Sequence, residues 1–147
     1  MLASSRTSGL VPNTISLQYE GTTGNAYHSI NIYNIEADNL SINNLIGYPK
    51  KCSGDKKVDH WVSFSRPNSG KKDREFFLNL ALDSSAINYK DEKIKAIQNI
   101  LRENVDQLLF AGCYDFLLNP SGKPVKDHTK FYFLVPEKKK LYEFESH

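Results

Sequence analysis

The residues best suited to chemistry are gathered in one short basic segment. His128 stands in the run Lys126-Asp127-His128-Thr129-Lys130, at the entry to a predicted strand. An imidazole can take up or release a proton near neutral pH, and lysines beside it can stabilise the negative charge that develops on phosphorus during phosphodiester cleavage. The segment therefore predicts a metal-independent ribonuclease site centred on His128.

A second proton-transferring group must come from elsewhere in the chain. Glu143, Glu145 and Glu75 are candidates for the complementary base, and His60 is a candidate for a second imidazole. Each can act only if the sheet brings it within hydrogen-bond reach of the reacting atoms. The predicted catalytic residues are therefore His128, His60, Glu143 and Glu145. The alternative is that His128 is an ordinary solvated residue at the start of a strand.

Lysines form clusters along a chain whose overall charge is small. Nineteen Lys and Arg face seventeen Asp and Glu, for a net charge of +2, which is well below that of a dedicated nucleic-acid-binding module. Clustered lysines in loops still predict a surface for a polyanion, although solvated turns and protected sheet edges give the same pattern. The predicted nucleic-acid-binding residues are Lys50, Lys51, Lys71, Lys72, Lys123, Lys126 and Lys130.

Two further patterns combine serine and glutamate on predicted strands. Ser63-Phe64-Ser65 follows Trp61 and Val62, and Glu143-Phe144-Glu145 lies on the last strand. The pair resembles the Ser-rich strand and Glu-x-Glu turn of the ADP-ribosyltransferases. That resemblance implies that the final glutamate orients a ribose while the glycosidic bond opens. It also requires an upstream arginine, for which the candidate is Arg6.

The sequence implies no metal and no cofactor. Cys52 and Cys113 belong to no Cys-x-x-Cys pair and to no His and Cys cluster with metal-ligand spacing, and are expected to be free thiols. Phosphate-binding glycine loops are absent. Residues 1–12 contain no apolar signal core and are predicted to be a flexible tail. We therefore expect a cytoplasmic protein that does not enter a membrane.

The remaining pattern predicts one α+β domain over residues 13–147, built from about six to eight short, mostly antiparallel strands and one helix. Alternation of polar and apolar residues around a Gly and Asn turn predicts a hairpin at 13–35, with a second strand covered on both sides. The segment 74–83 fits a strand or a helix, and we favour a strand paired with 60–66. The last strands are expected at 114–118, 131–135 and 141–145, with a tight reversal before the final one.

The predicted helix spans about residues 91–111. Asp91 is the expected N-cap, and Ile94, Ile97, Leu101, Val105 and Leu108 form its apolar stripe, with Gly112 at the C-cap. A helix is not expected in the Asn-rich segment 38–44, because its short polar side chains compete for backbone hydrogen bonds. The helix is expected to be scaffold, so functional residues are expected on the loops at 47–57, 67–74 and 119–130.

Three hypotheses for function follow from these features. The first is a small nucleic-acid-directed enzyme, such as a ribonuclease toxin or effector that uses His128. The second is a non-catalytic protein-binding module of inhibitor, immunity or phage-accessory type that uses loops and sheet edges. The third is a self-assembling structural domain. Substituting His128 with Ala separates the first two, because only an enzyme would lose an activity.

Overall fold

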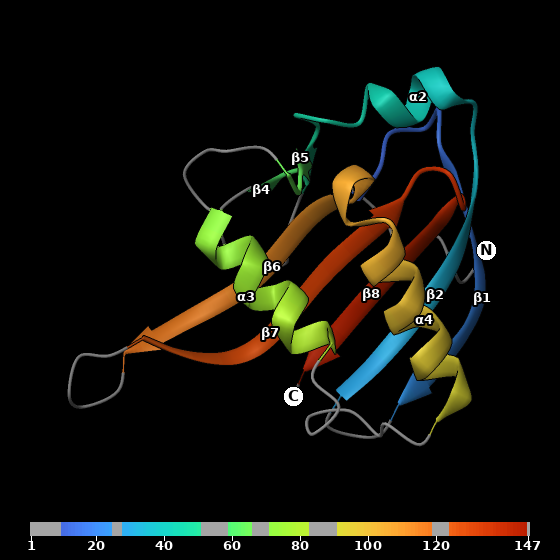
Figure 1. The fold of residues 1–147 in the computed structure, drawn as a ribbon. Coiled ribbons are helices and arrows are strands. Elements are labelled where there is room, and N and C mark those ends of the chain that lie inside the picture. The colour runs from blue at the N-terminus through green and yellow to red at the C-terminus, as the bar shows by residue number, and fades with distance from the viewer. Residues whose placement is uncertain are drawn as a thin grey trace.

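The computed structural model describes residues 10–24, 28–50, 59–65, 71–82, 91–118 and 124–146. Its body is a six-stranded antiparallel sheet with two helices laid across one face (Figure 1). The strand order is β1 (Ser16–Gly24), β2 (His28–Glu36), β8 (Lys140–Ser146), β7 (Pro124–Val135), β6 (Leu109–Leu118) and β5 (Val62–Ser63). Two short strands, β3 (Pro49–Lys50) and β4 (Asp59–His60), form a separate pair. The predicted α+β class and strand number are confirmed.

The two faces of the sheet carry two separate cores. The helix face is covered by α3 (Lys71–Leu82) and α4 (Glu92–Glu103), whose apolar residues pack against those of the central strands. The opposite face, here called the far face, has its own core. Strand β2 supplies both, with Ile30 on the helix face and Tyr33 and Ile35 on the far face, because side chains alternate along a strand. The expectation that this strand is covered on both sides is confirmed.

Among the residues that the structure describes, apolar side chains cover only part of the far face. Trp61 is fully buried there and its indole Nε1 donates to the Leu10 carbonyl oxygen at 2.9 Å. Leu10 itself is 3% exposed, so this part of the segment predicted as a tail packs on the sheet. The core of this face consists of Leu10, Ile15, Tyr33, Ile35, Ile42, Leu45, Trp61, Leu109, Ala111, Tyr132, Leu134 and Leu141.

Helix α4 begins as predicted but ends early. Asp91 caps it by accepting from the Lys93 backbone N–H at 2.8 Å, and Ile94, Ile97 and Leu101 are buried as expected. The prediction that the helix continues to residue 111 is wrong, because Asn104 ends it by donating its side-chain amide to the Ile100 carbonyl at 2.7 Å. A 3₁₀ turn (Val105–Gln107) follows, and Gly112 lies inside β6 instead of capping a helix.

The prediction of a strand at 74–83 is wrong, since residues 74–82 belong to α3. Arg74, Phe77 and Ala81 are buried at a spacing of three and four residues, whereas Phe76, expected on the buried strand face, is 51% exposed. Phe77 stacks on Phe110 with ring centroids 5.8 Å apart. The segment forms a helix because its buried side chains recur every three or four residues, and not at every second residue as in a strand.

The Asn-rich segment also forms a short helix, α2 (Asn39–Asn43), which contradicts the sequence expectation. The Asp38 carboxylate accepts from the Ser41 backbone N–H at 2.7 Å, so it satisfies the first turn as an N-cap. Ile42 and Leu45 are buried in the far-face core. The polar side chains that were expected to prevent a helix therefore start one.

Strands β1 and β2 form the predicted hairpin, but β1 contains a bulge. Tyr19 is opposite Tyr33 and Gly21 is opposite Ile32, so Glu20 is the extra residue. The bulge places Thr22 beside Asn31 on the far face. Its neighbour Thr23 then reaches the helix face, where its hydroxyl donates to the Asp91 carboxylate at 2.9 Å. This bond, followed by the Lys93 backbone N–H, lowers the pKa of Asp91.

The predicted reversal between β7 and β8 is confirmed at residues 136–139. Lys139 adopts a left-handed backbone conformation with φ of 50°, and its carbonyl accepts from the Ile35 N–H at 2.9 Å.

Among the described helices, none has the length and apolar character needed to span a membrane.

Candidate functional site

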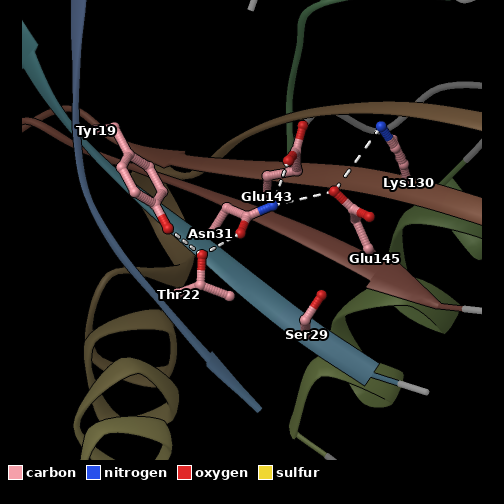
Figure 2. Close-up of a pocket in the computed structure, with 7 residues that line it drawn as sticks. All are labelled: Tyr19, Thr22, Ser29, Asn31, Lys130, Glu143 and Glu145. Carbon is pink, nitrogen blue, oxygen red and sulfur yellow. Dashed lines mark hydrogen bonds and ion pairs between the residues drawn. The ribbon is translucent and has the colours of Figure 1, made fainter. Parts of the chain in front are cut away.

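Beside the far-face core, the described residues form a polar pocket of about 480 Å³ that crosses β1, β2, β8 and β7 (Figure 2). Its geometry follows from strand register, because residues opposite one another on neighbouring strands form rows across the sheet. One row contains Thr22, Asn31, Glu143 and Tyr132, and the next contains Ser29, Glu145 and Lys130. The lining residues are Tyr19, Thr22, Ser29, Asn31, Lys130, Glu143 and Glu145.

Asn31 joins the two carboxylates. Its Nδ2 atom donates to Glu143 Oε1 at 2.7 Å and to Glu145 Oε1 at 3.0 Å. These two oxygens are therefore no more than 5.7 Å apart. Because an amide nitrogen donates two hydrogen bonds, one side chain fixes the separation of both acids.

A chain of hydroxyl groups holds Asn31 in this orientation. Thr22 Oγ1 donates to Asn31 Oδ1 at 2.6 Å, and the Tyr19 hydroxyl is bonded to the same threonine oxygen. A threonine has only one hydroxyl hydrogen, so Tyr19 must be the donor to Thr22. The bonds therefore run in one direction from the exposed tyrosine to the carboxylates (Figure 2).

Glu143 lies at the floor of the pocket and is 2% exposed. Burial raises the pKa of its carboxyl group, because the charged form is poorly solvated there. Hydrogen bonds from Asn31 and Tyr132 oppose this effect, as does the charge of Lys130. The pKa of the Tyr132 hydroxyl is raised as well, first by burial and then by the adjacent Glu143.

Glu145 occupies a more open position and forms an ion pair with Lys130. Its Oε1 atom is 3.8 Å from Lys130 Nζ, and the lysine side chain is half exposed. The two carboxylates thus differ in environment, one buried among neutral donors and one beside a cation. Pairs of acids separated in this way can divide the roles of proton donor and proton acceptor.

Three of the residues predicted from sequence for catalysis or binding come together in the pocket, namely Glu143, Glu145 and Lys130. His128 lies on β7, two residues before Lys130, and its side chain is outside the described residues. His60 is exposed on β4, in the small separate sheet, and is not among the described lining residues of the pocket.

The serine motif does not meet the glutamate motif. Ser63 lies on β5, which β6 and β7 separate from β8. Three strand spacings amount to roughly 14 Å. The Ser63 and Ser65 hydroxyls are instead 3.4 Å from each other, and Ser65 bonds to the Asp106 carbonyl. Arg6 lies outside the described residues.

The remaining lysines are spread over different elements. Lys71 and Lys72 begin α3 on the helix face, Lys50 is on β3 and Lys126 is on β7, with all four side chains outside the described residues. Lys51 and Lys123 lie outside the described residues altogether, as does Cys52.

Sequence reasoning missed Tyr19, Thr22 and Asn31. They are isolated polar residues on ordinary strands, and Asn31 is 112 positions from Glu143 in the sequence. A buried Asn opposite a buried Glu becomes visible only with the pairing of β2 and β8.

A scan against protein-family models gave no match, and comparisons with curated proteins and with solved structures gave none either. Within the described ranges, no three His, Cys, Asp or Glu side chains come together as a metal-binding group. A proposal about function therefore rests on the geometry of the pocket.

Proposed function

We propose that the protein is a ribonuclease that cleaves RNA without a metal ion at the far-face pocket. The observation that supports this is the convergence of two unlike carboxyl groups and one lysine, where Glu145 accepts a hydrogen bond from Asn31 and forms an ion pair with Lys130. Acid, base and cation are the three groups that such cleavage needs.

In the proposed reaction Glu145 accepts the proton of a ribose 2′-hydroxyl as its oxygen attacks phosphorus. Lys130 stabilises the negative charge on the phosphoryl oxygens. The bond from phosphorus to the 5′ oxygen breaks, and that oxygen takes a proton from Glu143, whose raised pKa favours the protonated form. The products are a 2′,3′-cyclic phosphate and a free 5′-hydroxyl, and exchange with water restores both carboxyl groups.

The test is cleavage of a fluorescently labelled RNA in the presence of EDTA. Glu145→Gln and Glu143→Gln should each reduce kcat by about 100-fold or more, because each removes a group that transfers a proton. Glu103→Gln is the matched control, since Glu103 is exposed in the last turn of α4 on the helix face. If His128→Ala loses activity while Glu143→Gln retains it, the imidazole of His128 is the acid in place of Glu143. Wild-type protein that cleaves no RNA would rule out the proposal.

A second candidate is the protein-binding module. It is favoured by β1, which ends the six-stranded order and exposes most of its side chains. An open strand edge can accept a strand from a partner. Amide hydrogen exchange on a complex purified from native cells tests this, because a bound strand slows exchange in β1. Slowing confined to other elements would contradict it.

A further inference from the structure

We infer that the substrate is single-stranded RNA and that Tyr19 is the platform on which one unpaired base stacks. The inference rests on the proposed function and adds the form of the substrate to it. The observation behind it is the exposed aromatic ring of Tyr19, which is not part of either buried core.

Tyr19 is 42% exposed, in contrast to the aromatic residues of both cores. Its ring packs against the buried Tyr33, with centroids 5.6 Å apart at an angle of 59°. Its hydroxyl is bonded to Thr22. The ring is thus held by two contacts, one with Tyr33 and one with Thr22, and Figure 2 shows its hydroxyl group reaching Thr22. A fixed ring loses little conformational entropy when a base stacks on it.

The pocket suits a single strand better than a duplex. Its volume of about 480 Å³ falls in the range of sites for one small ligand, here one nucleotide. In a duplex both faces of every base are covered by its neighbours, so no face is available to a protein ring. Recognition of RNA by aromatic side chains therefore depends on unpaired, splayed bases.

Charge supplies only part of the affinity expected at this site. Of the described residues that line the pocket, Lys130 alone is a cation, and it is paired with Glu145. One phosphate contact gives a shallow dependence of binding on salt, with a slope near −0.7 in a log-log plot for single strands. Base stacking therefore has to supply a larger share of the binding free energy here than it does in a protein that binds RNA in a basic groove.

The test compares three proteins on one unstructured RNA oligonucleotide and on the same sequence within a duplex. Wild-type protein should cleave the single strand and leave the duplex essentially intact. Tyr19→Leu retains bulk without a π-face and should raise KM roughly 10- to 100-fold. Phe76→Leu is the matched control, because Phe76 is an exposed ring on α3 at the helix face, and it should change KM by about threefold or less. In Glu145→Gln protein, a 2-aminopurine base in the oligonucleotide should be quenched on binding, and Tyr19→Leu should remove the quenching.

The results separate failure of the inference from failure of the proposed function. Equal cleavage of duplex and single strand, or an unchanged KM in Tyr19→Leu, overturns the inference and leaves the ribonuclease proposal standing. Absence of cleavage of any RNA by wild-type protein overturns both. Circular dichroism of each variant establishes that it is folded.

Discussion

At the scale of single residues, the pocket depends on one carboxyl group that is buried and one amide that holds it. The pKa of Glu143 is raised from its usual value of 4.5, so the native state retains this proton at pH values where the unfolded chain has released it. The stabilisation that the protonated carboxyl provides is complete below the unfolded pKa and is lost as pH rises through the folded pKa.

This linkage predicts how Glu143→Gln changes stability with pH. Between the unfolded and folded pKa values, wild-type protein should lose as much as about 1.4 kcal/mol of unfolding free energy per pH unit relative to the variant, which has no proton to release there. Urea unfolding of both proteins from pH 4 to pH 8 measures the difference. A difference that stays constant over this range would contradict a raised pKa.

Asn31 should contribute to stability as well as to the site. Asn31→Ala removes the donor shared by both carboxylates and should lower the unfolding free energy by about 1–3 kcal/mol, because the buried Glu143 loses a partner. Asn99→Ala is a suitable control, because Asn99 is exposed on α4 and bonds only to Arg102 among the described contacts. Equal unfolding curves for the two variants would argue against the role given to Asn31.

Part of this site could be predicted from sequence and part could not. Glu143, Glu145 and Lys130 belong to neighbouring strands of a hairpin, so local pattern was enough to nominate them. Tyr19, Thr22 and Asn31 enter through the pairing of β2 with β8, a contact between the two ends of the chain. Alternation within a strand gives no information about which distant strand lies beside it.

At the scale of elements, the first and last strands and the start of α4 follow the sequence pattern, while α2 and α3 depart from it. The segment of α3 fits both periods, and only the sheet beneath it decides between them. The early end of α4 was hidden because Val105 and Leu108 continue the apolar spacing beyond the helix, into a 3₁₀ turn.

Adjacent phenylalanines in α3 test the helical assignment. Phe77 is fully buried among Phe110 and Phe131, whereas Phe76 is half exposed. Phe77→Ala should cost about 3–5 kcal/mol of unfolding free energy, and Phe76→Ala should cost less than about 1 kcal/mol. A strand with Phe76 facing inward predicts the reverse order, so urea unfolding of the two variants decides between them.

At the scale of the whole molecule, the sheet separates the helix face, which forms a packed core, from the far face, which carries the candidate site. The helix face is closed by α3 and α4, and the far face carries the pocket. The sequence predicted the α+β class because strand-like alternation surrounds a helical stripe. It did not predict the strand order, which depends on contacts between residues far apart in the chain.

This separation predicts which lysines matter for RNA cleavage. Lys130→Ala should reduce kcat/KM by about tenfold or more, because it removes the charge next to the reacting phosphate. Replacing Lys71 and Lys72 together by Ala should change it less than about threefold, since α3 begins on the other face. A larger loss from the α3 pair would move the RNA-binding surface to the helix face.

The bulge in β1 also couples the opening of the two faces of the sheet. The bulge accommodates Glu20 without changing the faces of the residues after it. Thr22 therefore bonds to Asn31 on one face of the sheet, and the adjacent Thr23 bonds to the Asp91 cap on the other. Local opening of this edge strand would release both bonds at once. In native-state hydrogen exchange, the amides of β1 and the first turn of α4 should therefore exchange as one cooperative unit. Thr23→Val should uncouple them, because it removes the bond to the Asp91 cap and leaves Thr22 bonded to Asn31.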